Sequence, residues 1–465
     1  MSTRQRLSFG VRPPAVPLAL PLPRRAATGL FLVFAFAYFL SALLRAVTAT
    51  LAPVLADEFG LHAGDLGLLS GGYFLGFAAT QLPLGAWLDR HGPRRVLLGF
   101  LGAAVLGCLL FSLASGFAGL WAGRVLCGAG LGACLMAPLT GYRRWYSAAA
   151  QLRANAWMMM TGSLGMVAST LPVQWLLPVA GWRPLFWGLA ALIVLAMAWI
   201  ARGVPAWNPA PGQATPAVDT ASAWLPGQGP KAAAASSLTS AAAASPALTE
   251  NPVDTGYAAV WRHPYFWRIA PLGFFLYGGM VAVQTLWAGP WMQQVAGYSA
   301  LQAATGLFWI NASMLCAFWL WGLVGQHMVR RQVDNNRLMA ASLPISLVVL
   351  AAAVWLGEQA GAAVWALYCV SCTSITLSLP TLAQAFPRAL AGRALSAYNL
   401  VIFGGVFVVQ WGIGLLVDAF AAQGATPVQA FRAAMVLYLA CNAGAYAWFL
   451  LRAPRHNAVP DLAAP

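Results

Sequence analysis

Long apolar runs separated by short polar breaks extend along most of this chain. Twelve of these runs approach the roughly 20 residues that an α-helix needs to cross a bilayer. The pattern therefore predicts an all-α polytopic membrane protein with twelve transmembrane helices in two six-helix bundles. We place the helices at 29–55, 66–88, 96–113, 118–140, 155–177 and 184–201, and at 265–288, 301–324, 338–356, 361–385, 395–417 and 430–451.

A segment of different composition separates the two sets of six. Residues 204–262 are rich in Ala, Pro, Ser, Thr and Gly and contain few large apolar side chains. Such a composition predicts a disordered cytoplasmic linker. The expected organisation is a cytoplasmic tail at 1–28, an N-terminal bundle at 29–203, the linker at 204–262, a C-terminal bundle at 263–452 and a second cytoplasmic tail at 453–465.

The two bundles show weak internal similarity. Residues 39–52 match 275–288 in character, and Arg153-Ala154 precedes Gly165 by the interval that separates Arg393-Ala394 from Gly405. Parallel repeats of this kind predict two pseudo-repeat bundles around an axis along the membrane normal, with a substrate site at their interface near the midplane.

Composition and charge agree with a membrane protein. Hydrophobic residues make up 60% of the chain and charged residues 8%, and the mean hydropathy is +0.70, which excludes a soluble domain. With the amino terminus in the cytoplasm, only Arg183 and Arg432 fall outside, as the positive-inside rule requires. The net charge of +15 is therefore explained by cytoplasmic loops of a multi-pass protein of the cytoplasmic (inner) membrane, and no nucleic-acid partner is expected.

A basic turn at 85–95 is the most distinctive motif. Its spacing is Gly-x-x-x-Asp-Arg-x-Gly-x-Arg-Arg, and it separates two of the apolar runs. With twelve spans, this turn resembles the loop between helices two and three of the major facilitator superfamily. The resemblance implies a transporter that works by rocker-switch alternating access, with these residues in gating: Gly85, Asp89, Arg90, Gly92, Arg94 and Arg95.

Two roles are open for the charged residues of this motif. Asp89 lies at a helix end, where its carboxylate would accept hydrogen bonds from a neighbouring helix amino terminus or pair with arginines and so steady one conformation. The alternative is that the arginines only fix topology.

Arg124, followed by Gly128, Gly130 and Gly132, resembles the arginine of the family's fourth helix. The roles open for it are a brace, proton coupling or direct substrate contact.

Arg45 carries the clearest indication of the substrate. It lies ten residues before the acidic outer end of the first span, which at a rise of about 1.5 Å per residue is about 15 Å deep. No carboxylate is predicted at that depth, and the planar guanidinium suits a carboxylate or phosphate. An anionic substrate would supply the missing partner, whereas backbone carbonyls or water would satisfy a purely structural arginine.

The seventh helix narrows the choice of anion. Organic-phosphate exchangers of the family resemble this arrangement but pair a first-helix arginine with a basic residue in helix seven, where this chain has Val281, Ala282 and Gln284. A small organic monoanion such as a carboxylate is therefore favoured. The polar and aromatic residues expected at the substrate site, together with Arg45, are Thr48, Tyr73, Gln284, Trp287, Asn311, Asn399 and Gln410.

Other classes of function are less consistent with the sequence. No nucleophile-and-base set or metal cluster is visible, so neither an enzyme nor a cofactor or metal is expected. Cys369 and Cys372 have metal-ligand spacing but lie in an apolar span without a second pair, which indicates packing. The alternatives that stay open are efflux of hydrophobic drug-like compounds and a non-transporting sensor or scaffold. The expected partners are a small solute and membrane lipid, with the monomer as the functional unit.

Overall fold

The computed structural model describes residues 23–207, 256–330 and 334–452, and within these ranges the regular structure is helical, without strands. The predicted tails and most of the predicted linker lie outside the described residues. Two described parts of the predicted linker adjoin the bundles. Residues 204–207 continue from the N-terminal bundle, and α9 (Tyr257–Arg262) precedes the C-terminal bundle and packs on it.

The helices of the first half cover the residues of the predicted N-terminal bundle. The predicted break at 85–95 is a kink inside α2, because the backbone leaves helical geometry at Gly92, with φ 75° and ψ 165°. Glycine is suited to this position because side chains with a Cβ rarely adopt such a positive φ. The elements are α1 (Arg24–Phe59), α2 (Ala63–Leu113), α3 (Phe117–Leu131), α4 (Ala133–Trp145), α5 (Ala148–Ala168), α6 (Leu171–Ala180) and α7 (Trp182–Gly203).

The second half includes several interrupted helices. Two π-helical segments, η2 and η3, lie in its first span, and a 3₁₀ segment, η5, interrupts its fourth. The remaining elements are α10 (Pro264–Pro271), η2 (Leu272–Tyr277), α11 (Gly278–Ala282), η3 (Val283–Trp287), α12 (Ala288–Gln294), α13 (Ala300–Arg330), α14 (Asn335–Leu356), η4 (Gly357–Gln359), α15 (Ala362–Ser371), η5 (Cys372–Leu377), α16 (Ser378–Gln384), α17 (Arg388–Ala422) and α18 (Pro427–Leu451).

The helices confirm a polytopic membrane protein. In the described residues, ten helices are long and apolar enough to span a membrane, and the pair α5 and α6, bent by 41°, makes up to eleven. Since α2 contains two predicted spans on either side of Gly92, the arrangement is consistent with the twelve predicted helices. The observed helices mostly extend beyond the predicted ends, because helical hydrogen bonding continues past the apolar core.

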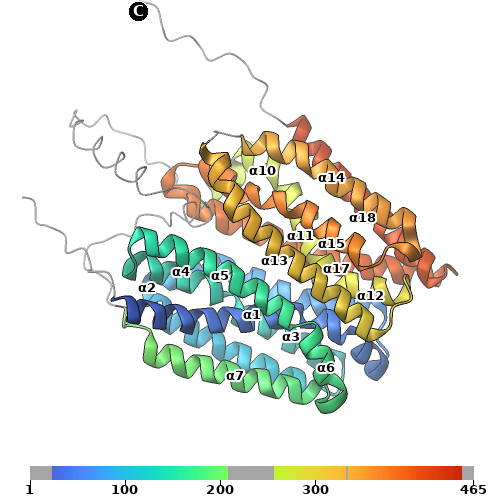
Figure 1. The fold of residues 1–465 in the computed structure, drawn as a ribbon, viewed down its shortest axis with the longest axis horizontal. Helices are drawn as coiled ribbons and strands as arrows, with labels where there is room; N and C mark the ends of the chain where they lie inside the picture. Colours follow the sequence, from blue (N-terminus) through green and yellow to red (C-terminus); the bar gives the residue numbers. More distant parts are fainter. Residues whose placement is uncertain (1–22, 208–255, 331–333, 453–465) are drawn as a thin grey trace, which may run out of the picture.

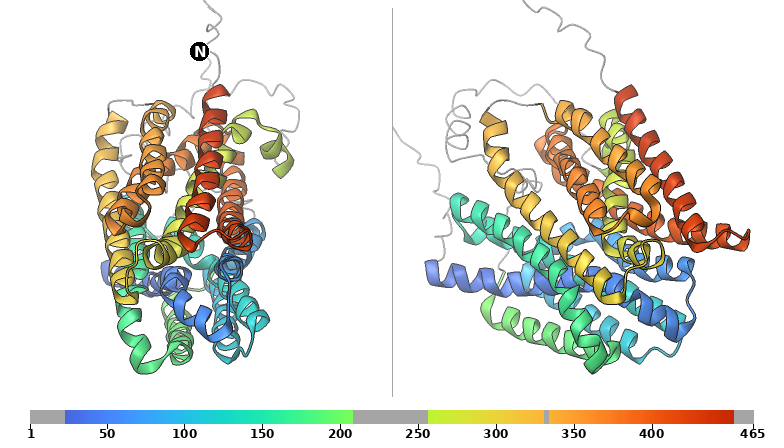
Figure 2. Two further views of the ribbon diagram at one scale, coloured as in Figure 1. Left: turned by 90° about the vertical axis from the view of Figure 1, so that its right-hand side faces the viewer. Right: turned by 45° about the vertical axis from the view of Figure 1, so that its right-hand side comes forward.

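The two halves form the arms of a V (Figure 1). They converge where α1 ends, α2 begins and α17 ends, which we call the closed end, and diverge where α1, α10 and α17 begin, which we call the open end. The right-hand view in Figure 2 shows the same divergence. Cross-half packing joins α2 to α17, α1 to η3 and α12, and α5 and α6 to α13.

Glycines allow the backbones of α2 and α17 to touch at the closed end. A Cβ on Gly67 would lie 2.4 Å from the Gln410 carbonyl oxygen, and a Cβ on Gly414 would lie 2.3 Å from the Ala63 carbonyl oxygen. Small residues drive helix association in membranes because lipid tails leave little hydrophobic advantage to larger ones. The closed end is therefore held by direct backbone packing.

The open end lacks an equivalent joint core. Among the described residues, one buried cluster at this end consists of C-terminal side chains only, including Phe266, Leu382, Phe386 and Tyr398. The large cluster that contains residues of both halves includes Leu66, Leu69 and Val409 at or near the closed end. The halves thus share a core towards one end of the molecule.

Equivalent glycine contacts support the internal repeat. A Cβ on Gly165 of α5 would lie 2.4 Å from the Phe39 carbonyl oxygen, and a Cβ on Gly405 of α17 would lie 2.4 Å from that of Phe274. The sequence comparison pairs Gly165 with Gly405 and Phe39 with Phe275. The contacts therefore recur within one residue of the predicted correspondence.

A glycine in the N-terminal half provides a test of this packing. A Cβ on Gly128 of α3 would lie 1.8 Å from the Tyr73 carbonyl oxygen, whereas a Cβ on Gly99 of α2 would meet nothing within 4 Å. We expect Gly128→Ala to destabilise the protein by about 1–3 kcal/mol or more, because α2 and α3 must separate. Gly99→Ala, the matched control, should be neutral or stabilising by about 0.5–1 kcal/mol.

Thermal unfolding in detergent measures both glycine variants. A melting temperature for Gly128→Ala equal to that of Gly99→Ala would contradict the close approach of α2 and α3.

Candidate functional site

Arg45 is the one partly exposed residue in a buried stretch of α1. Every other residue from 41 to 52 is buried. The Arg45 Nε atom is itself buried and has no hydrogen-bond partner, and none of the ion pairs within the described residues includes Arg45. The tertiary structure therefore leaves this deep cation without a counter-charge from the described protein.

Two tyrosines, one from each half, lie close to Arg45. The Tyr73 hydroxyl of α2 donates a hydrogen bond to the Ser41 carbonyl oxygen at 3.3 Å. Tyr277 ends the π-helical segment η2 in the other half. Both phenol groups are near enough to interact electrostatically with the Arg45 guanidinium. Arg45 thus lies at the interface between the halves.

Arg124 is a second buried cation beside the same tyrosine. It is completely buried, its Nη1 donates to the Leu44 carbonyl oxygen at 2.8 Å, and its guanidinium carbon lies 5.1 Å from the centre of the Tyr73 ring. Its Nε and Nη2 atoms have no hydrogen-bond partner. Arg124 therefore clamps the α1 backbone one residue before Arg45 and adds a second positive charge.

Neither cation is neutralised by a described acid. The ion pairs of the described chain join Asp65 to His62, Glu58 to Arg183 and Asp334 to Arg337, all at helix ends. No group of three or more potential metal-ligating side chains occurs in the same residues. Because an uncompensated charge away from water is costly, an anionic group would stabilise either guanidinium.

Buried amides of the C-terminal half form a separate network. Gln284 Nε2 donates to Asn311 Oδ1 at 2.9 Å, and Gln410 Nε2 donates to Thr285 Oγ1 at 2.9 Å. The Trp287 indole N–H donates to the Gln410 carbonyl oxygen at 3.1 Å. These bonds connect η3 to α13 and α17, so this network braces helices of one half.

The remaining predicted substrate residues lie in different surroundings. Thr48 is buried on α1, one turn from Arg45. Asn399 is partly exposed on α17. Phe403, one turn further along α17, contacts Phe77 across the halves with ring centres 4.3 Å apart. The structure therefore groups Arg45 with Tyr73, and separately groups Gln284, Asn311, Trp287 and Gln410.

The predicted gating turn lies at the open end and is packed against the start of the linker region. Trp207 covers Gly92 so closely that a Cβ there would lie 2.2 Å from the indole, and Arg144 lies 4.7 Å from the Trp207 ring. Arg94 donates a hydrogen bond to the Ala201 carbonyl oxygen. Arg90 and Arg95 are exposed and Gly85 has no close neighbour.

Asp89 contacts its own half in this conformation. The carboxyl group is half-buried, and Arg143 of α4 is near enough to interact with it electrostatically. The turn and its acid are therefore positioned on the N-terminal half, without a described contact to the C-terminal half.

Some relevant residues were not among the sequence-based candidates. Tyr277 approaches Arg45 from the other half, and Trp207 packs on Gly92 although it lies in the predicted linker. The glycines that join α2 to α17 are spaced three to four residues apart, at Gly64, Gly67 and Gly71, and this small-residue stripe could have indicated a helix contact. No sequence signal pairs it with α17.

The chain is similar in sequence to a family model and to several transporters. A family model described as Major Facilitator Superfamily matches residues 34–410. The curated relatives include a "Probable L-galactonate transporter" of Escherichia coli, 28% identical over 181 residues, which are 38% of this chain and 39% of the relative. They also include the "Probable sulfoacetate transporter SauU" of Cupriavidus necator, 28% identical over 167 residues, which are 34% of this chain and 37% of the relative.

A third curated relative is the "Gallate transporter" of Pseudomonas putida, 32% identical over 161 residues, which are 33% of this chain and 35% of the relative. The chain thus matches less than two fifths of the length of these relatives. Among solved structures, a bacterial homologue of the human lysosomal transporter Spinster, inward-facing and unoccupied, has a TM-score of 0.69 and 16% identity, covering 93% of this chain and 98% of that chain. The D-xylose-proton symporter has a TM-score of 0.63 and 14% identity, covering 89% and 96%. These structural similarities show the fold.

A double-mutant cycle tests the amide brace. We expect Gln284→Ala and Asn311→Ala to be non-additive, with a coupling of about 0.6 and at most about 1.7 kcal/mol, because each variant removes the same interhelical bond. Gln284→Ala combined with Asn399→Ala is the matched control and should be additive. Reversible unfolding in mixed micelles measures the cycle, and additivity in the first pair would contradict the brace.

Proposed function

Because the chain belongs to the major facilitator superfamily, we propose that it carries a small organic monoanion across the cytoplasmic membrane by rocker-switch alternating access. Family and relatives indicate a transporter and not an enzyme. The observation that carries the anion proposal is Arg45, a deep cation between the halves without an acidic partner among the described residues. A substrate carboxylate would fit this guanidinium through paired hydrogen bonds.

The relatives support an organic anion as the substrate, whereas the restriction to a monoanion rests on the absence of a basic residue near Gln284. Their names specify galactonate, sulfoacetate and gallate, and each of these is an organic anion. Tyr277 of the C-terminal half is near enough to interact electrostatically with Arg45 of the N-terminal half. A substrate held there would contact both halves. Its binding could then be coupled to the movement of one half relative to the other, because the contacts would differ between the two conformations.

Orientation follows from the positions of the arginines. Arg183 and Arg432, the two that the positive-inside rule places outside, both lie at the closed end. Arg183 pairs with Glu58 at 2.5 Å, and Arg432 donates to the Val354 carbonyl oxygen at 3.0 Å. We infer that the closed end faces outwards, that both termini are cytoplasmic and that this structure is the inward-open conformation of a functional monomer.

Substitution of Arg45 tests the substrate class. We expect small organic monoanions to raise the melting temperature of the purified protein, and Arg45→Gln to abolish that rise because the cationic partner is lost. In a binding assay the loss should be about tenfold or more, since a charge-assisted hydrogen bond contributes about 1.5–3 kcal/mol. Arg337→Gln is the matched control, because Arg337 is a largely exposed arginine at the open end.

The same thermal-shift screen includes lipophilic cations. Stabilisation by cations and not by anions, or by anions equally in Arg45→Gln, would reject the proposed substrate class and favour efflux of drug-like compounds.

Asp89 is proposed as a gate residue of the open end. In the inward-open conformation its carboxylate is near Arg143 of its own half; on closure it would accept hydrogen bonds from a helix amino terminus of the other half. We expect Asp89→Asn to lower the population of the alternative conformation, in which the two halves meet at the end that is open here. Transport should slow severalfold. Asp334→Asn is the matched control, because Asp334 pairs locally with Arg337.

Distance measurements between spin labels on the two halves at the open end report the population. Unchanged distances and unchanged transport in Asp89→Asn would leave the turn with a topological role only.

A further inference from the structure

The first turn of α2 contains more backbone donors than its own half satisfies. The first amides of a helix have no partner within the helix. The His62 amide donates to Asp65 Oδ2 at 3.0 Å, and the Asp65 amide is capped in turn by the His62 side chain. The amides of Ala63 and Gly64 are left for a partner from elsewhere.

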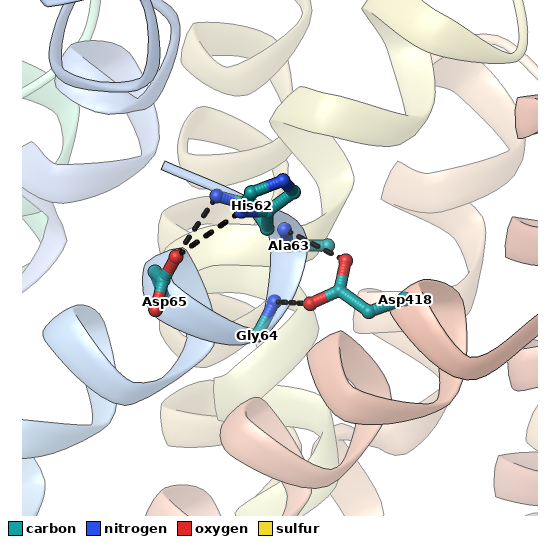
Figure 3. A network of polar contacts seen from close by, with 5 residues as sticks. All are labelled: His62, Ala63, Gly64, Asp65 and Asp418. Carbon is teal, nitrogen blue, oxygen red and sulfur yellow. Dashed lines mark hydrogen bonds and ion pairs between the residues drawn. The ribbon is translucent and has the colours of Figure 1, made fainter. Parts of the chain in front are cut away.

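Asp418 of the other half supplies that partner. Its Oδ1 accepts from the Ala63 amide at 3.1 Å and its Oδ2 accepts from the Gly64 amide at 2.7 Å. Figure 3 shows the carboxylate of α17 facing the start of α2, with Asp65 on the opposite side of the same turn. One carboxylate from the C-terminal half therefore completes the capping of a helix in the N-terminal half.

The electrostatics of this contact are favourable. The amino terminus of a helix carries a partial positive charge, and a carboxylate that accepts two amides there makes charge-assisted hydrogen bonds. No lysine or arginine is paired with Asp418 in the described ion pairs. Its described polar contacts are those two amides.

Glycine makes the contact geometrically feasible. A Cβ on Gly64 would lie 2.7 Å from Asp418 Oδ2 and 3.3 Å from Leu415 Cδ2. One turn further along α2, Gly67 allows the backbone of Gln410 to approach directly. The carboxylate and the backbone contact belong to the same α2–α17 interface.

We propose that Asp418 and the amides of Ala63 and Gly64 form a latch that holds the closed end shut and whose release accompanies opening of that end. This role rests on the proposed alternation between conformations and not on the identity of the substrate. The capping by Asp65 and His62 remains within one half when the halves separate, whereas the Asp418 bonds must break. Asp418 thereby sets the ratio of the two conformations.

A buried reporter at the closed end allows a direct test. Ser70 is completely buried and lies on α2 on the same face as Gly67 and Phe74. Ser70→Cys adds little volume, and the introduced thiol would react with a polar maleimide when the closed end opens. The background carries Cys316→Ala and Cys441→Ala, because these are the exposed cysteines of the described chain.

We expect Asp418→Asn to raise the labelling rate of this introduced thiol by about three- to tenfold, because the charge and one acceptor are lost. Asp65→Asn is the matched control: it removes the same charge from the same helix end without touching the other half, and the rate should stay unchanged. Gly64→Ala should raise the rate without any change of charge, and it keeps the test valid if Asp418→Asn does not fold.

Gly67→Ala distinguishes rejection of the latch proposal from rejection of alternating access itself. A Cβ there would overlap the Gln410 carbonyl oxygen, so this variant forces α2 and α17 apart. Faster labelling in Gly67→Ala together with an unchanged rate in both Asp418→Asn and Gly64→Ala would overturn the latch and leave alternation intact. An equal rise in Asp65→Asn would also overturn it, and an introduced thiol that stays unreactive in every variant would reject both the latch and the opening of this end.

Discussion

The backbone contact between α2 and α17 is the interaction on which the arrangement of the two halves depends. Helices gain little from hydrophobic burial inside a lipid environment, so close packing at small residues must hold them together. Gly67 and Gly414 let the two backbones touch, and Phe77 and Phe403 extend the contact towards the middle of the molecule. The halves meet along this line and diverge beyond it, which leaves one end closed and the other open.

The charges near the centre are distributed unequally between the halves. The N-terminal half contributes two deep arginines, and the C-terminal half contributes Tyr277 and a network of neutral amides. The amides satisfy one another, so they stabilise the packing of η3, α13 and α17. Arg124 donates to the Leu44 carbonyl oxygen and so has a structural contact, whereas no ion pair of the described residues includes Arg45. The two halves therefore differ in chemistry although they share a fold.

Short-range features of the fold were predictable because they depend on residues close together in the chain. Apolar length identified the membrane helices, since a helix satisfies its own backbone hydrogen bonds. The turn at 85–95 indicated the family, and Gly92 within it adopts a positive φ that favours glycine. The depth of Arg45 stays a prediction, made from its distance to the acidic end of the span. The pairing of Gln284 with Asn311 was not predictable, because a buried amide bonds equally well to a solute or to another helix.

Sequence alone determined the membrane class, the internal repeat, the superfamily resemblance and the presence of an unpaired deep arginine, because each depends on composition, spacing or local helical geometry. Tertiary structure decided which end of the molecule is closed, which residues surround Arg45 and which helix end receives Asp418. These contacts join segments separated by hundreds of residues, such as Gly64 and Asp418, and several are made by backbone atoms whose chemistry is the same in every residue. Only the folded arrangement of the helices specifies such partners.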